Sequence, residues 1–485
     1  MPEARPIKSE NMYISSSLGV LFSRGVGLFA GVASLWLLTR ILDEVDFAAY
    51  MLAMSMVYVC GFLGGFGLQR VLLLKISPLP ATPGILHGAQ LARSVGIRVF
   101  ISSTSLAVVV AAALYAFPDI SAENNVAPWF LMLAPIVPAV AMTVWLIAWL
   151  QSNYIVGRPQ SIYGQVDGLR CAGLGVVFAM GLSAFAVAFA AVAATIVPPL
   201  LAALRCIDKT ESEPSSFDWH DIIDGLNFFG LRCAEIGMRH ADIIVLGFFA
   251  PPEAVASYVI ASRLALILEA GQLVFAPAYA PRARQHVINN SHQQAKREYE
   301  VSRQLGLIAS GTVVFFLVIL GEPLLHVFSA GEEAYKVLLV VSAGQILLVG
   351  AGLHSAHLSM SGHLPLTMAL QLSGLFIFVF LLFELVPTYG ALGAATAFWV
   401  VNLFLALTGL GALWWTCRIA VLGLFNSASW LVLVISILVA GYNPEYSRVS
   451  AAFMLLALAA LLVRERDLIK SVASDVRKLV FHRSV

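Results

Sequence analysis

Long apolar runs separated by short polar connections fill the chain from residue 17 to residue 463. Each run approaches the ~20 residues that a helix needs to cross the hydrocarbon core of a bilayer. The pattern therefore predicts an all-α, polytopic membrane protein with about fourteen spanning helices. We expect them at 17–42, 48–74, 91–117, 126–150, 160–182, 184–204, 222–249, 256–280, 301–320, 337–361, 364–385, 391–415, 419–441 and 447–463.

The composition supports this interpretation. Hydrophobic residues make up 59% of the chain and charged residues 12%, whereas about 25% of a soluble domain is charged. The long first apolar run, which contains Arg24, predicts a retained helix rather than a cleaved signal peptide. The five cysteines form no CxxC motif, so neither a disulfide nor a metal site is expected from them.

Charges are sorted between alternate connections, although the net charge is only +1. Basic residues concentrate in one set of connections and acidic residues in the other. By the positive-inside rule, this distribution predicts that both termini are cytoplasmic. The basic set includes Lys75, Arg93, Arg158, Arg205, Lys296 and Arg297, and the acidic set includes Asp43, Asp119, Glu253, Glu332 and Glu333.

A polar stretch near the middle of the chain suggests an internal repeat. Superposing the second half on the first aligns Arg24 with Arg232 and Tyr50 with Tyr258. Repeats in transporters place the substrate site where the two halves meet. We therefore expect two pseudo-symmetric six-helix lobes around a central cavity, and two further helices. The predicted division is an N-lobe at 1–206, a cytoplasmic linker at 207–220, a C-lobe at 221–416, the extra helices within 417–463 and a basic cytoplasmic tail at 464–485.

Four ionisable residues stand out within one apolar segment. Arg232, Glu235, Arg239 and Asp242 are spaced three, four and three residues apart, which places them on one face of a helix. Ionisable groups at membrane depth are costly and usually face a bundle interior or a water-filled cavity. The spacing therefore predicts that the protein binds or moves a polar substrate within the bilayer.

Other embedded charges extend this candidate site. Guanidinium groups bind phosphate oxygens in bidentate fashion, and a buried carboxylate that gains a proton or a cation can bias a conformational equilibrium. Glu269 is the preferred coupling residue because we expect it in mid-helix with no arginine one turn away. The substrate-binding candidates are Arg24, Arg170, Arg232, Arg239 and Arg263, and the ion-coupling candidates are Asp167, Glu235, Asp242 and Glu269.

A second interpretation of the same residues remains open. They could form ion pairs that only stabilise the fold. Asp167 would then pair with Arg170, and Arg239 would pair with Glu235 or with Asp242. His354 and His357 are three residues apart, but a HxxH pair without a nearby carboxylate or cysteine is a poor metal site. We expect these histidines to line the polar interior, and we expect no metal and no cofactor.

The chain carries none of the common enzyme motifs. A Walker A sequence, HExxH, GxSxG and a dinucleotide-binding fingerprint are all missing from the sequence. We therefore expect a transporter rather than an enzyme. Its driving force would be an ion gradient or the consumption of its product.

Several stretches resemble bacterial polysaccharide transporters of the O-antigen flippase type. The opening segment FSRGVGLFAGVASLWLLTRIL is similar to the start of that family. The segment HADIIVLGFFAPPEAVASYVIASRLALI matches its pattern with Asp242, Gly247, Tyr258 and Arg263. The segment FELVPTYGALGAATAFWVVN resembles the family's Y-G-A-x-G-A-A motif. The resemblance extends to the wider multidrug, oligosaccharidyl-lipid and polysaccharide exporter superfamily.

The resemblance implies export of undecaprenyl-pyrophosphate-linked oligosaccharide by alternating access. The substrate would move from the cytoplasmic to the outer leaflet of a bacterial inner membrane, for O-antigen, capsule or exopolysaccharide synthesis. Membrane lipids, H⁺ or Na⁺ and a polysaccharide polymerase are the further partners that it suggests; no nucleic acid is expected. The embedded arginines are nearly balanced by acids, which departs from a purely basic cavity.

Two other functions compete with this one. A cation-coupled multidrug exporter of the same fold typically has twelve spans and needs more acids than arginines in its cavity. A membrane-embedded glycan polymerase or ligase usually carries a large outer loop with catalytic residues. The outer connections here, such as 119–125 and 322–336, are too short for that.

Overall fold

The computed structural model describes most of the chain. It covers residues 10–76, 86–117, 125–153, 157–206, 219–269, 279, 283, 291–417, 424–442 and 444–464. In several helical stretches, including 10–24 and 219–228, it describes the backbone alone. Over these ranges the chain forms helices joined by short turns, with no regular strand. The predicted all-α class is confirmed.

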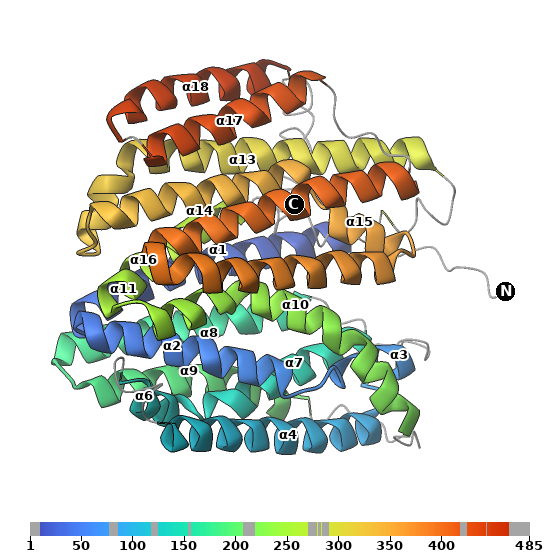
Figure 1. The fold of residues 1–485 in the computed structure, drawn as a ribbon. Helices are drawn as coiled ribbons and strands as arrows, with labels where there is room; N and C mark the ends of the chain where they lie inside the picture. Colours follow the sequence, from blue (N-terminus) through green and yellow to red (C-terminus); the bar gives the residue numbers. More distant parts are fainter. Residues whose placement is uncertain are drawn as a thin grey trace, which may run out of the picture.

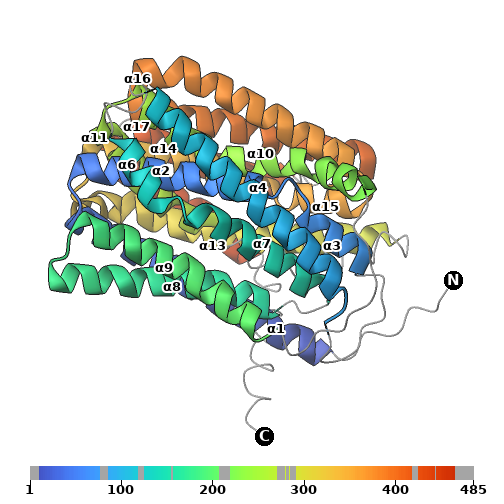
Figure 2. The same cartoon turned by 90° about the horizontal axis from the view of Figure 1, so that it is seen from below.

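The first half of the chain supplies one set of packed helices. They are α1 (Glu10–Ile41), α2 (Glu44–Leu63), α3 (Gln69–Ile76), α4 (Ala89–Ala116), α6 (Val126–Leu133), α7 (Ile136–Ser152), α8 (Gly157–Met180) and α9 (Ala184–Leu204). Helix α1 packs along α8, and α8 packs along α9. Figure 2 shows these three helices together on one side of the bundle. Helix α2 packs on α6 and α7, and α4 packs on α7.

The second half forms a comparable set. It contains α10 (Trp219–Phe249), α11 (Pro252–Ala265), η2 (Leu266–Glu269), α13 (His292–Val327), α14 (Glu332–Ala351), α15 (His354–Met360), α16 (Leu364–Cys417), α17 (Leu424–Tyr442), η3 (Pro444–Tyr446) and α18 (Ser447–Arg464). Helix α14 is central because α11, α13, α16 and α17 all pack on it. Helices α17 and α18 lie at the edge of the bundle (Figure 1).

Length and hydropathy identify the spanning helices. Six described helices are long and apolar enough to cross a membrane, and the bent pair α6 and α7 makes a seventh. Helix α16 counts once in this total although it turns back on itself, and several shorter apolar helices complete the bundle. The described helices follow the predicted segments in order, so a total of about fourteen fits.

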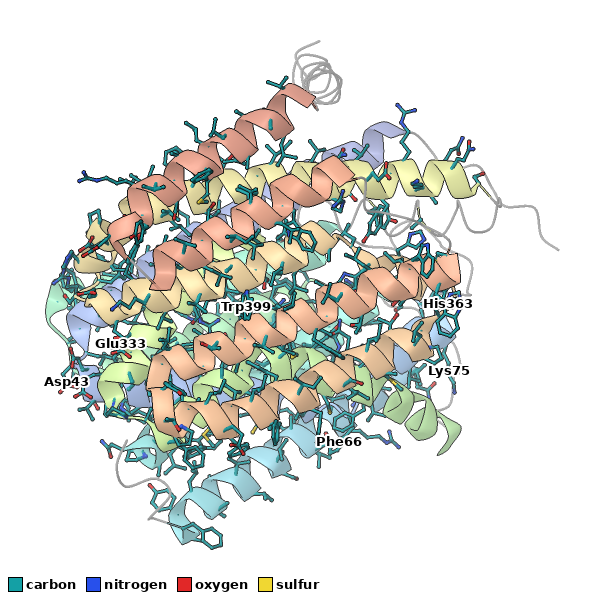
Figure 3. All side chains as sticks on the ribbon, turned by 45° about the horizontal axis from the view of Figure 1, so that its top comes forward. Asp43, Phe66, Lys75, Glu333, His363 and Trp399 are labelled. Carbon is teal, nitrogen blue, oxygen red and sulfur yellow. The ribbon has the colours of Figure 1, made fainter. Side chains whose placement is uncertain are left out.

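Polar residues mark the two ends of the bundle. Asp43 and Glu333 lie at one end and Lys75 and His363 at the other (Figure 3). The acidic connections at Asp43 and Glu333 therefore lie opposite the basic connection at Lys75, as the positive-inside rule predicts for the two faces of a membrane. The linker at 207–218 and the tail at 465–485 lie outside the described residues.

Glycine and proline divide three of the predicted helices. The segment 48–74 breaks after α2 in a turn where Gly67 has a φ of 73°. The segment 126–150 bends by 44° between α6 and α7, where Pro135 precedes α7. The segment 337–361 breaks between α14 and α15. Each break corrects a prediction of one continuous helix, because proline removes a backbone donor and glycine tolerates a positive φ.

The segment with the Y-G-A-x-G-A-A pattern forms a tight reversal. Gly390, within α16, has φ 53° and ψ −129°, a conformation that strongly favours glycine. A Cβ atom at Gly393 would overlap the carbonyl oxygen of Leu385. The two halves of α16 therefore fold back against each other (Figure 1). The predicted spans 364–385 and 391–415 are these two halves.

Replacing Gly390 by alanine is expected to destabilise the protein by about 1–3 kcal/mol, because a side chain strains this backbone conformation. Gly411→Ala in the same helix is the matched control, since a Cβ atom there meets open space. Thermal unfolding in detergent would compare the two variants. Equal unfolding midpoints would show that a side chain at position 390 does not strain the backbone.

The two halves of the chain meet chiefly through α2. This helix packs against α10 and α11, and α3 also contacts α10. One continuous set of buried apolar residues extends from α1 and α2 to α17 and α18. The division into two lobes stays a prediction. The contact of α2 with α10 and α11 is where the charged residues of interest lie.

Candidate functional site

The four charged residues of α10 occupy different environments. Arg232 Nη1 lies 2.7 Å from Glu235 Oε2, and the two side chains are 41% and 46% exposed. Asp242, further along the helix, is only 6% exposed. Arg232 and Glu235 thus neutralise each other, whereas Arg239 and Asp242 find their partners on other elements.

Arg239 pairs with Glu269, which no predicted pairing included. The Arg239 Nη2 atom lies 3.7 Å from Glu269 Oε2, and Gln345 Nε2 donates a 3.1 Å hydrogen bond to Glu269 Oε1. The sequence has no arginine one turn from Glu269, and the arginine that contacts it comes instead from another helix, α10. The Arg239–Glu235 pair is excluded in this conformation, because Glu235 contacts Arg232.

The position of Glu269 also differs from the prediction. Helix α11 ends at Ala265, and Glu269 is the last residue of the 3₁₀ turn η2. Ser310 Oγ donates a 2.6 Å hydrogen bond to the Leu268 carbonyl oxygen. The carbonyl groups that a change from α-helix to 3₁₀ turn leaves unpaired need other partners, and Ser310 of α13 supplies one here. Glu269 therefore lies in a 3₁₀ turn that follows α11, not within the α-helix.

Asp242 is held by α11. One carboxylate oxygen accepts a 2.7 Å hydrogen bond from the Tyr258 hydroxyl, and the other accepts a 2.8 Å bond from the Ile243 backbone amide. Arg263, also on α11, interacts electrostatically with Asp242 and with Tyr58 of α2. A buried carboxylate needs such partners because desolvation of its charge is costly.

A second group of polar residues connects α8 to α10 through α2. Arg170 Nη2 donates a 2.7 Å hydrogen bond to the Tyr58 hydroxyl. The Tyr58 ring stacks on His240 of α10, with ring centroids 5.8 Å apart and planes inclined by 14°. Tyr58 is thus the residue of the first half that links Arg170 to the charged face of α10.

Asp167 lies one turn before Arg170 on α8 and interacts with it electrostatically. It faces α1, since a Cβ atom added at Gly27 would lie 3.3 Å from Asp167 Oδ2. The suggested Asp167–Arg170 pair is therefore compatible with the structure, although Arg170 hydrogen-bonds to Tyr58. The side chain of Arg24 lies outside the described residues.

Three of the five candidate arginines thus gather near the contact between the two halves. We call these residues and their partners the inter-half polar cluster: Tyr58, Arg170, Arg239, His240, Asp242, Tyr258, Arg263, Glu269 and Gln345. It contains three arginines and two acids, and Asp167 lies beside Arg170 as a third acid. The arginines can still bind an anion, because Arg170 donates its hydrogen bond to a hydroxyl group and the Arg239–Glu269 contact is 3.7 Å long.

Four members of this cluster were not among the predicted site residues: Tyr58, His240, Tyr258 and Gln345. Tyr258 had a signal, since it belongs to the family pattern that also contains Asp242 and Arg263. Tyr58 and Gln345 had none, because tyrosine and glutamine are common in apolar helices. His240 could have been found, since it adjoins Arg239 within the charged segment. The spacing argument selected only residues three or four apart, and it left out His240 because consecutive residues do not share a helix face.

His354 and His357 belong to a different group. The His357 ring hydrogen-bonds to the Tyr279 hydroxyl, and His354 Nδ1 lies 3.2 Å from the Gly352 carbonyl oxygen. Both lie on α15, just after the break that follows α14. Among the described residues, no group of three or more His, Cys, Asp or Glu side chains could hold a metal ion.

Comparisons with known proteins agree with this architecture. A family model of polysaccharide biosynthesis proteins matches residues 14–285. The lipid II flippase MurJ, in an inward closed conformation, superposes with a TM-score of 0.69 at 14% identity, over 94% of this chain and 100% of that chain. No curated protein matches the sequence.

Transporters with other substrates share the fold. An inward-facing multidrug resistance transporter of the MATE family, within the MOP superfamily, gives a TM-score of 0.61 at 14% identity, over 84% of this chain and 98% of that chain. A MOP superfamily transporter from Pyrococcus furiosus gives a TM-score of 0.57 at 14% identity, over 84% of this chain and 95% of that chain. The family match covers more than half of the chain. The chain therefore belongs to the polysaccharide biosynthesis protein family and has the fold of the MOP-superfamily flippases and transporters.

Proposed function

We propose that the protein is a flippase for undecaprenyl-pyrophosphate-linked oligosaccharide. It would carry this lipid from the cytoplasmic to the outer leaflet of a bacterial inner membrane, for O-antigen, capsule or exopolysaccharide synthesis. The observation that supports the proposal is the inter-half polar cluster, where Arg170 donates its hydrogen bond to a hydroxyl group and Arg239 has one long contact, to Glu269. Guanidinium groups suit a pyrophosphate in geometry and in charge.

The partners of these arginines leave room for a stronger ligand. Arg170 donates to the Tyr58 hydroxyl oxygen, and the Arg239–Glu269 contact is long at 3.7 Å. Phosphate oxygens are charged and accept stronger hydrogen bonds. A pyrophosphate would therefore replace these contacts at a modest cost. The glycan would pass through the polar interior while the lipid tail stays in the bilayer.

Alternating access would follow from movement of the two halves about α2. This helix touches α10 and α11, so a change in their relative position would expose the cluster to one leaflet and then to the other. The sorted charges of the connections support a topology with both termini in the cytoplasm. In this proposal the protein performs no covalent chemistry.

The acids supply a candidate coupling site for H⁺ or Na⁺. Asp242 already accepts hydrogen bonds from Tyr258 and from a backbone amide. Glu269 accepts one hydrogen bond from Gln345 and makes one long contact with Arg239. Its negative charge is therefore less strongly stabilised than that of Asp242. We therefore assign coupling to Glu269 before Asp242. The contacts of Glu235 and Asp167 fit structural roles better.

A cation-coupled multidrug exporter is the second candidate, because MATE transporters share the fold. A cationic drug would need carboxylates in excess at its binding site. The inter-half polar cluster has no such excess, since its three arginines at least equal the acids even when Asp167 is counted. The charge of the cluster therefore favours the lipid pyrophosphate.

Depletion of the protein in its native host tests the proposal. We expect lipid-linked oligosaccharide to accumulate in the cytoplasmic leaflet, and surface polymer to disappear because a polymerase on the outer side receives no substrate. The measurement is the leaflet distribution of the labelled lipid. Normal surface glycan together with greater sensitivity to cationic drugs would refute the flippase and support the exporter.

A further inference from the structure

His240 is a buried residue with unused hydrogen-bonding capacity. Its side chain is 7% exposed, and its Nδ1 atom has no hydrogen-bond partner. The ring stacks on Tyr58, at the contact between the two halves. Buried polar atoms are normally paired, so an unpaired nitrogen beside a cluster of arginines suggests that a ligand completes its contacts.

The charges around His240 are mostly positive. Arg239 precedes it in the sequence, Arg263 projects from α11, and both interact with the ring electrostatically. Tyr58 of α2 brings Arg170 of α8 close through its hydroxyl group. A proton added to His240 would create a further positive charge beside these groups, which is unfavourable while no anion is bound.

The acids near His240 are already engaged. Asp242 accepts from Tyr258, and Glu269 of η2 contacts Arg239. The contact that α16 makes near His240 is apolar, because Leu375 packs on Gly237, one turn before His240.

Two described charged residues of the helices that pack on α10, Glu384 and Lys75, lie toward its ends. Glu384 of α16 follows Phe383, whose ring contacts Phe249 at the last residue of α10. Lys75 of α3 lies at the end of the bundle (Figure 3). The field at His240 is therefore set by arginines that a polyanionic ligand would neutralise.

We propose that His240 is a proton-binding residue of the phosphate site, which takes up a proton when a pyrophosphate binds and donates a hydrogen bond to it from Nδ1. This inference rests on the proposed function. A protonated imidazole donates from both ring nitrogens, and the ligand supplies the negative charge that makes the proton favourable. By linkage, a lower pH tightens binding of the lipid pyrophosphate, and its release is accompanied by release of the proton.

Because His240 lies at the contact between the two halves, its protonation affects how they pack. Its ring stacks on Tyr58, and Tyr58 accepts from Arg170 on another helix of the first half. A change in the charge of His240 therefore acts directly on the contact between α2 and α10. Proton uptake and substrate binding would shift this contact together.

Isothermal titration calorimetry with undecaprenyl pyrophosphate tests the proposal on the full-length protein in detergent. Titration at pH 7 in two buffers with different heats of ionisation gives the number of protons taken up per ligand. We expect uptake approaching about one proton for the wild-type protein and close to none for His240→Asn. Asparagine keeps a hydrogen-bond donor near the Nδ1 position without titrating, so binding should weaken by less than about tenfold.

Two further variants sharpen the test. His240→Gln is the substitute if the asparagine variant does not fold. His326→Gln is the matched control, because His326 is exposed at the end of α13, and it should take up protons like the wild type.

The outcomes separate this inference from the proposed function. Binding without proton uptake, or equal uptake by the wild type and the His240 variants, would overturn the role of His240 and leave the flippase intact. Failure of the wild-type protein to bind the lipid pyrophosphate would overturn the phosphate site as well.

Discussion

Replacing Arg263 by glutamine is expected to reduce the rate of lipid-linked oligosaccharide transport by about 100-fold or more. Arg263 is partly buried on α11, and its charge attracts that of Asp242. The substitution removes a guanidinium from the proposed phosphate site. Each hydrogen bond to a charged group contributes about 1.5–3 kcal/mol, a bidentate contact contains two of them, and each 1.4 kcal/mol corresponds to a factor of about ten.

Transport of a fluorescent or isotope-labelled substrate into proteoliposomes would measure this effect. Arg98→Gln is the control, because Arg98 lies exposed on α4 and bonds to Ser94 of its own helix. Arg263→Lys should restore only part of the rate, since lysine cannot bind a phosphate in bidentate fashion. Wild-type transport by well-folded Arg263→Gln protein would refute the role of this residue.

A double substitution distinguishes a ligand from a structural partner. If Arg263 served only to neutralise Asp242, then Arg263→Gln combined with Asp242→Asn would recover transport, because neither charge would be left unpaired. If Arg263 binds phosphate, the double variant stays inactive while its thermal stability recovers. We expect the second result.

Replacing Gly350 by alanine is expected to destabilise the protein by about 1–3 kcal/mol, as overpacking of a buried site does. Gly350 lies in the last turn of α14, and a Cβ atom there would overlap the ring of Trp430 from α17. Trp430 is 5% exposed and donates a 2.9 Å hydrogen bond to the Ile346 carbonyl oxygen. The ring cannot move without losing this bond.

The contact matters because α13 holds the same turn of α14. Arg303 donates to the Gly350 carbonyl oxygen and Tyr299 to that of Ala351. These bonds satisfy carbonyl groups that the end of a helix leaves without partners. Displacing Trp430 would loosen the attachment of α17 to the end of α14, and the C-terminal pair with it.

Thermal unfolding in detergent would measure the change in stability. Gly306→Ala is the matched control, because a Cβ atom there would lie 3.7 Å from Val349 of α14, an ordinary contact distance. An unfolding midpoint of Gly350→Ala equal to that of the control would show that Trp430 can move freely.

The positions of the helices were largely predictable, but their breaks were not. Apolar length alone located the spanning segments, because water is absent from the hydrocarbon core and every backbone group must be paired within the helix. The breaks at Gly67, Pro135 and Gly352 were missed. Glycine and proline occur in many continuous membrane helices, and neighbouring helices decide whether the backbone bends.

The candidate site was predictable in its residue types and not in its pairing. The spacing of Arg232, Glu235, Arg239 and Asp242 located the charged face of α10. It suggested that Arg239 pairs with Glu235 or Asp242 of the same helix, whereas Glu235 pairs with Arg232. Arg239 and Asp242 instead contact residues that follow in η2 and α11.

The sequence by itself determined the class of the protein, the approximate helices and which charges fall within apolar helices, because these depend on the local cost of placing residues in an apolar medium. Only the tertiary structure decided which charges meet, where Glu269 lies and that Tyr58 and His240 join the two halves. Such contacts depend on side chains from segments far apart in the chain. Their distances follow from how the helices pack, which spacing along one helix does not encode.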